Sequence, residues 1–300
     1  MNTHKSIPIK DAINRCLDYI EKGGSDMSDI LSGYPSLDKL TRGWGPGELI
    51  VMAARPCVGT TTLGLNFARN AAVDFKIPTV YFSLDLGTID LTIRLIASES
   101  GLHFYTLRDP GNMSDEDWIR MESSIRPLTQ APLFIDDSVG STVEKIMERM
   151  EEYIANDSAK FFILDSFQMF FSHREKSLPG PSVPDREKSL WLLKDFALKK
   201  GVTIMITAYL RRPMQKKFYR PTPADLDTYC PGAEEYADKI ILPYRPYLLD
   251  FLDTRHERYE PMELMLVKNK NGETGSRAVL KFDKHTLKIS ESTENDDLYG

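Results

Sequence analysis

The sequence predicts an α/β fold with a central, mostly parallel β-sheet flanked by helices. From residue 48 onward, short apolar runs typical of buried strands alternate with longer segments of helical periodicity. This alternation indicates parallel strands, because each crossover helix returns the chain to the same edge of the sheet. With 300 residues and 41% hydrophobic content, the chain has enough apolar material for one large core or two smaller ones.

Composition and charge bear on nucleic-acid binding, membrane contact, disulfides and zinc sites. The net charge of −6 leaves no global attraction for nucleic acid, so DNA binding would need a local basic patch. The longest apolar runs, such as 202–206, are too short to cross a membrane, and the polar start lacks a secretory signal, so we expect a cytoplasmic protein with no membrane contact. The cysteines at 16, 57 and 230 are solitary, and the histidines are scattered, which predicts neither disulfides nor zinc.

An amphipathic linker helix is predicted at residues 7–22, ahead of the strands. Its apolar positions follow helical spacing: Ile9, Ala12, Ile13, Cys16, Leu17 and Ile20. We expect residues 1–33 to form this helix and a linker, 34–290 the α/β domain, and 291–300 an acidic flexible tail. The helix either packs on its own domain or reaches a neighbouring subunit, and the sequence leaves both open.

The elements of the domain follow from the same patterns. Strands are predicted at 49–54, 79–84, 133–136, 160–165, 202–209, 239–242, 262–267 and 278–282. Helices are predicted from about 61, 88, 115 and 142 and at 188–200, after an exposed loop over 172–187. Capping boxes are indicated where Ser114 precedes Asp117 and where Ser141 precedes Glu144.

The strand at 49–54 runs into a candidate phosphate-binding loop. Its residues are Arg55, Pro56, Cys57, Val58, Gly59, Thr60, Thr61 and Thr62. A P-loop needs a glycine for close backbone approach, a lysine that reaches the β and γ phosphates, and a hydroxyl for Mg²⁺ at the helix start. Gly59 and Thr61 meet two of these needs, but Thr60 stands where the lysine belongs. An ordinary strand, turn and helix would look the same locally, so the motif alone does not decide.

A carboxylate ends the predicted strand at 160–165. Ligands of open α/β sheets bind at the carboxyl ends of the strands, which makes Asp165 a candidate Mg²⁺ partner together with Thr61. An aspartate at a strand end also suits a helix cap or a turn.

A basic segment follows the strand at 202–209. Its cations are Arg211, Arg212, Lys216, Lys217 and Arg220, and two aromatic residues lie between them. Cations beside aromatic rings suit single-stranded DNA, although a solvated charged loop has the same composition. Arg174 and Lys176 form a second candidate patch after Asp165, which interspersed acidic residues weaken.

Several segments together resemble the motor domain of the DnaB-type replicative DNA helicases. They are residues 36–56, 80–84, 114–118, 131–137, 163–165, 237–238 and 267–275, with Leu107 and Gln168 between them. The ordered matches cover roughly residues 9–290. The resemblance implies a RecA-like P-loop core, a ring of typically six subunits, ATP between subunits and single-stranded DNA in the channel. It also implies that the helix at 9–22 docks on the adjacent subunit.

This chain departs from the family mainly in its catalytic residues. Thr60 replaces the P-loop lysine, and Asp85 replaces the glutamate that resembles the family's general base. Tyr209 stands where the family has a phosphate-sensing glutamine. Lys270 replaces the arginine finger, while its companion Lys268 is retained.

These departures predict impaired ATP hydrolysis. An arginine finger contributes about 10³ to 10⁵ in rate, and lysine lacks its planar fork. Each lost group that stabilises the transition state costs on the order of 3 to 5 kcal/mol. ATP with Mg²⁺ could still bind, since residues 59–62 offer backbone amides at a helix start. Arg55 is an alternative source of the missing charge.

We therefore expect a DnaB-like protein that binds nucleotide weakly, forms a homo- or hetero-oligomeric ring and contacts single-stranded DNA or an active replicative helicase. Two alternatives stay open. One is a working helicase, alone or completed by an active subunit in a mixed ring. The other is a regulator that docks on a helicase ring through its N-terminal helix.

Overall fold

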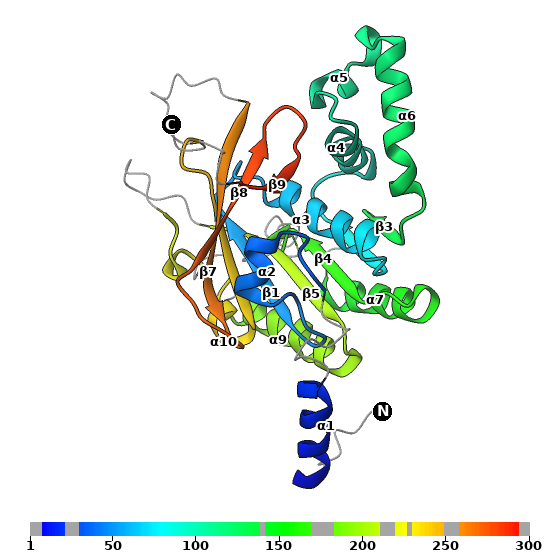
Figure 1. Cartoon of the computed structure of the whole chain (residues 1–300). Coiled ribbons are helices and arrows are strands. Elements are labelled where there is room, and N and C mark those ends of the chain that lie inside the picture. The colour runs from blue at the N-terminus through cyan, green and yellow to red at the C-terminus, as the bar shows by residue number, and fades with distance from the viewer. Residues whose placement is uncertain are drawn as a thin grey trace, which may run out of the picture.

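A nine-stranded sheet lies at the centre of the protein (Figure 1), with the order β3-β2-β4-β5-β1-β6-β7-β8-β9. The computed structural model describes residues 8–21, 30–138, 142–169, 183–210, 220–226, 230–248 and 258–293. The strands are β1 (Leu49–Ala54), β2 (Thr79–Ser83), β3 (Leu133–Asp136), β4 (Phe161–Asp165), β5 (Thr203–Tyr209), β6 (Lys239–Tyr244), β7 (Tyr259–Asn269), β8 (Arg277–Asp283) and β9 (Ile289–Glu291). The predicted α/β class with a mostly parallel sheet is confirmed.

Strand direction divides the sheet into two parts. The six strands from β3 to β6 are parallel, and β7, β8 and β9 continue the sheet as antiparallel strands. The parallel strands therefore place their carboxyl ends at one edge, here called the carboxyl edge. Because β7 runs the other way, its last residues lie at the opposite, amino edge, where Asn269 pairs with Lys239 at the start of β6.

Helices cover both faces of the sheet (Figure 1). The helices of the described residues are α1 (Ile9–Glu21), which projects away from the sheet in Figure 1, α2 (Pro35–Thr41), α3 (Thr60–Arg69), α4 (Thr88–Ser100), α5 (Phe104–Arg108), α6 (Asp115–Thr129), α7 (Val143–Asp157), α9 (Val183–Lys200) and α10 (Ala233–Tyr236), with a π-helical turn at Asn70–Asp74 and 3₁₀ turns at Pro110–Asn112 and Pro223–Asp225. None of the helices in these described ranges has the length and apolar composition that crossing a bilayer requires.

Strand alternation builds one apolar layer on each face. Leu49 and Val51 of β1 belong to the cluster that α7 and α9 cover, whereas Ile50 and Met52 belong to the cluster covered by α2 and α3. All six residues of β1 are buried, as expected for a strand covered on both faces.

The segment from residue 30 to 44 packs on the domain. Ile30 forms an antiparallel bridge with Trp44, and the Nδ2 group of Asn70 donates a hydrogen bond to the carbonyl of Ser32 at 2.9 Å. Trp44 is fully buried with its ring edge-on to Phe67 of α3. Residues 30–33, which the sequence interpretation grouped with the linker, therefore contribute to the core.

Three details differ from the sequence predictions. The cap of α7 is Thr142, whose hydroxyl accepts the Lys145 amide, rather than Ser141, which lies outside the described residues; the capping box of Ser114 and Asp117 is confirmed. The helix α9 begins at Val183 instead of 188, because the charged residues before 188 continue its turns. Glu291, where the tail is predicted to begin, is still strand, because β9 pairs with β8.

Candidate nucleotide-binding site

A pocket of about 400 Å³ lies at the start of α3, beside the carboxyl edge of the sheet. Residues of the predicted phosphate loop form one wall: Cys57, Gly59, Thr60, Thr61 and Thr62. Apolar side chains of Leu86, Phe282 and Leu287 form another part. A cavity of this size is typical of sites for small molecules.

The turn before α3 shapes the phosphate loop. Gly59 precedes the helix with φ of +106°, a left-handed conformation that a side chain would strain. Within the described part of the chain, no side chain caps this helix start, so the first amide groups of α3 remain available to an anion. The loop therefore retains the backbone part of a phosphate site, while Thr60 supplies a hydroxyl in place of an amine.

The other three residues of the predicted phosphate loop are not part of the pocket wall. Among the described residues, Arg55, Pro56 and Val58 do not line the pocket, and the Arg55 side chain is only 5% exposed. The interpretation that Arg55 replaces the missing lysine thus has no support from its position.

Asp165 is the last residue of β4 and contacts the first turn of α3. Thr61 Oγ1 donates to Asp165 Oδ2 at 2.6 Å, so the two predicted Mg²⁺ ligands do come together. Tyr81 donates its phenol hydroxyl to the same oxygen at 2.8 Å, and Thr207 donates its hydroxyl to Oδ1. An ionised carboxylate offers about four acceptor positions, so these three donors leave about one. A metal ion held by Asp165 through more than that one position would have to displace one of these hydroxyl donors.

Three basic residues line the pocket from elements far from the loop in sequence: Arg94 of α4, Arg245 after β6, and Lys284 after β8. Glu260 pairs with two of them, since Arg245 Nη2 lies 2.6 Å from its Oε2 and Lys284 Nζ lies 2.8 Å from its Oε1. Burial acts to raise the pKa of Glu260, but these cations outweigh it and lower the pKa below its ordinary value. Three cations against one carboxylate leave this wall positively charged.

Sequence reasoning missed these three cations. Each is distant from the loop in sequence: α4 carries Arg94 to the pocket, and the return of β6 and β8 to the carboxyl edge brings Arg245 and Lys284 there. Arg245 also stacks over Phe282, with its guanidinium carbon 4.3 Å from the ring centre, so its position is fixed by packing as well as by charge.

Tyr209 is the last residue of β5, and Asp85 follows β2, so both lie at the carboxyl edge of the sheet. Tyr209 lines the pocket, whereas Asp85 is exposed beside it, after β2. Burial, together with the negative charges of Asp85 and Asp165, raises the pKa of Tyr209, so its phenol stays neutral at ordinary pH. A neutral phenol can donate to a ligand but does not supply charge.

Lys268 and Lys270 lie at the amino edge, away from the pocket of their own chain. Lys268 Nζ donates to the carbonyl of Glu234 at 2.6 Å, and Lys270 Nζ lies 3.5 Å from Asp238 Oδ1. Burial, with the positive charge of Lys270, lowers the pKa of Lys268, and Asp238 opposes this shift. The length of β1, six residues or roughly 20 Å, separates this edge from the loop.

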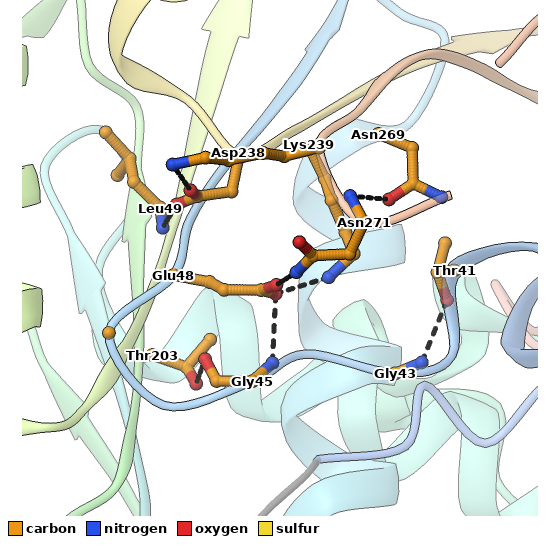
Figure 2. Close-up of polar contacts among 12 residues, drawn as sticks. Thr41, Gly43, Gly45, Glu48, Leu49, Thr203, Asp238, Lys239, Asn269 and Asn271 are labelled. Atoms are coloured by element: carbon orange, nitrogen blue, oxygen red, sulfur yellow. Dashed lines mark hydrogen bonds and ion pairs between the residues drawn. The ribbon is translucent and has the colours of Figure 1, made fainter. Parts of the chain in front are cut away.

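Figure 2 shows the polar network that fixes the amino edge. Asp238 accepts the Leu49 amide at 2.8 Å, and Glu48 accepts the Gly45 amide and the Asn271 side chain while pairing with Lys239. These contacts bind the start of β1 to β6 and to the residues after β7. The two lysines therefore project from a fixed surface.

Most of the predicted DNA-binding residues lie outside the described residues: Arg174, Lys176, Arg211, Arg212, Lys216 and Lys217. Arg220 is described, and its guanidinium binds Glu263 through two hydrogen bonds of 2.8 and 2.9 Å. Glu263 is fully buried and also pairs with Arg277, which gives Arg220 a structural contact.

Comparison with known protein sequences identifies the family. The family model for the DnaB-like helicase C terminal domain matches residues 29–291. The chain is 30% identical to the replicative DNA helicase DnaB of Leifsonia xyli subsp. xyli over 89% of its length, and 28% identical to the replicative DNA helicase DnaC of Bacillus subtilis over 92%. It spans only 58% and 60% of these relatives.

Solved structures share the fold. The structure is similar to a solved ATPase domain, with a TM-score of 0.85 at 21% identity over 96% of this chain and all of that one. It is also similar to a solved DnaB-like replicative helicase, with a TM-score of 0.81 at 21% identity over 98% of this chain and 69% of that one. This chain belongs to the DnaB-like helicase C-terminal domain family and has its RecA-like fold.

Proposed function

We propose that this chain is a ring subunit of the DnaB-like family that binds a nucleotide in the pocket at α3 but hydrolyses it very slowly. The observation that carries the proposal is the replacement of an amine by the Thr60 hydroxyl in an otherwise formed phosphate loop. The amides of α3 and the basic wall support binding of phosphates. The same pocket lacks an amine in the loop position from which a P-loop lysine reaches the β and γ phosphates.

The placement of Lys268 and Lys270 supports assembly. Both project from the amino edge and cannot reach the pocket of their own chain, so they would act on a nucleotide held by a neighbouring subunit. The apolar residues of α1 also favour a neighbour, because they are at least half exposed in the chain by itself: Ile9, Ile13, Leu17 and Ile20. A helix with such a stripe needs a partner surface to bury it.

ATP turnover by the purified chain tests the proposal. With single-stranded DNA present, we expect a rate at least about 10³-fold below that of an active relative measured in parallel. Thr60→Lys alone should leave the rate low, because Asp85 and Lys270 still replace the family's glutamate and arginine. DNA-stimulated turnover within tenfold of the active relative would refute the proposal.

A mixed ring is the second candidate function. The exposed side chain of Lys270, 65% accessible, lies where a partner's bound nucleotide could be approached. If this chain completes an active partner's site, adding it to that partner should change the partner's turnover, and Lys268→Ala should remove the change. Lys199→Ala on α9 is the control, since it removes an exposed amine elsewhere on the surface.

A further inference from the structure

We infer that the pocket at α3 binds the phosphates of its nucleotide without a divalent metal ion. The inference rests on the proposed nucleotide binding and concerns how the charge of that ligand is balanced. Two features carry it. The acceptor positions of Asp165 are largely filled by hydroxyl groups, and basic side chains line the same pocket.

The hydroxyl donors of Asp165 are held in place by burial. Tyr81 is fully buried and Thr207 is 1% exposed. Burial and the charge of Asp165 raise the pKa of Tyr81 well above its ordinary value, which keeps the phenol protonated and donating. A metal ion that took more than the one remaining acceptor position of Asp165 would have to displace Thr61, Tyr81 or Thr207, and the last two are buried away from water. An unsatisfied buried donor is costly, so the hydroxyl arrangement competes with the metal.

Close packing prevents Tyr81 from turning away. Its hydroxyl lies beneath α3 at Gly64, where an added Cβ would come within 3.4 Å of both the ring and the oxygen. The phenol thus packs against α3 while it donates to Asp165, which favours this position of the Tyr81 hydroxyl.

The pocket wall supplies the positive charge that a metal would otherwise bring. Arg94, Arg245 and Lys284 line it, and Glu260 is the carboxylate that pairs with the last two. The Nε group of Arg94 is buried and has no hydrogen-bond partner within the described part of the chain, so a phosphate oxygen would satisfy it. Guanidinium groups suit this role because they match phosphate geometry.

Calorimetric titration of the full chain with ATP, in excess MgCl₂ and separately in excess EDTA, tests the inference. We expect dissociation constants that agree within about threefold. Tyr81→Phe and Thr207→Val free acceptor positions on Asp165, so each should make binding stronger in MgCl₂ than in EDTA by about tenfold, the scale of one lost charged hydrogen bond. Inorganic triphosphate serves as a second probe that lacks the base.

Tyr153→Phe is the matched control, because Tyr153 also donates its hydroxyl to an aspartate, Asp136, which ends β3 and does not line the pocket. It should bind ATP equally in both solutions.

Wild-type binding that weakens tenfold or more in EDTA would overturn the inference while leaving nucleotide binding intact. Binding in neither solution would overturn both the inference and the nucleotide part of the proposed function. Thermal melting shows whether each variant is folded. If Tyr81→Phe does not fold, Thr207→Val still tests the inference.

Discussion

At the scale of single residues, Thr60 takes the position of a P-loop lysine, which would perform two tasks. A lysine in this position both holds the phosphates and stabilises the charge that develops during their transfer. Here the holding is assigned to Arg94, Arg245 and Lys284, which come from other elements and line the pocket wall. Within the described residues, Arg245 is both bound to Glu260 and packed on Phe282, whereas Lys284 has only the pairing with Glu260 and Arg94 only the stacking on Phe104.

The first prediction therefore concerns Arg94 and Lys284. Arg94→Gln and Lys284→Gln should each raise the dissociation constant for ATP about tenfold or more, because each removes a charged hydrogen bond to phosphate. Fluorescence titration with a labelled ATP analogue measures this. Lys145→Gln on α7 is the control, an exposed lysine far from the pocket whose loss should have no effect. Wild-type affinity in both pocket variants would show that the basic wall does not contact the ligand.

At the scale of elements, α3 connects the pocket to the N-terminal part of the domain. Its first turn lines the pocket, and Phe67 near its end packs edge-on against Tyr34 and Trp44, with ring centres 5.9 Å away in both cases. Tyr34 in turn donates its hydroxyl to the Ile289 carbonyl of β9. One helix thus joins the phosphate loop to the segment before β1 and to the last strand.

The second prediction tests this connection. Phe67 is 1% exposed, so Phe67→Ala should lower the free energy of unfolding by about 3 to 5 kcal/mol, the usual cost of such a cavity. Chemical denaturation followed by tryptophan fluorescence measures it, since Trp44 touches Phe67. Phe75→Ala, at a ring that is 38% exposed, should cost far less. Equal losses in the two variants would mean that the edge-on aromatic group adds no stability.

The elements also show which features the sequence could predict. The strands β1, β2, β4 and β5 were predictable because burial on both faces produces unbroken apolar runs, as in β1. The start of α9 and the strand β9 were not, because charged residues at 185–187 suggested a loop and β9 lies at the border of the polar tail, where its pairing with β8 makes it a strand. In the site, Thr61 and Asp165 were predictable from local motifs. Tyr81, Thr207, Arg94, Arg245 and Lys284 were not, since long-range strand order brings them together.

At the scale of the whole molecule, the pocket and the two lysines proposed to act on a neighbour's nucleotide lie at opposite edges of the sheet. The nucleotide pocket lies at the carboxyl edge, and Lys268 and Lys270 lie at the amino edge, fixed by the network around Glu48 and Asp238 (Figure 2). A single chain therefore cannot bring its two lysines to its own ligand. Any contribution of these lysines to a nucleotide requires a second subunit in a head-to-tail contact, which is the geometry of a ring.

The last prediction follows from that requirement. If α1 mediates the contact, Leu17→Asp should shift the chain toward monomer, because a carboxylate would enter the apolar stripe that a neighbour buries. Mass photometry or sedimentation at matched concentrations, with and without ATP, measures the distribution. Asp18→Asn is the control on the same helix, one residue away and outside the apolar stripe of Ile9, Ile13, Leu17 and Ile20. It should keep the wild-type distribution. An unchanged assembly in Leu17→Asp would exclude the α1 stripe as the contact and leave the lysine-bearing amino edge as the surface to test next.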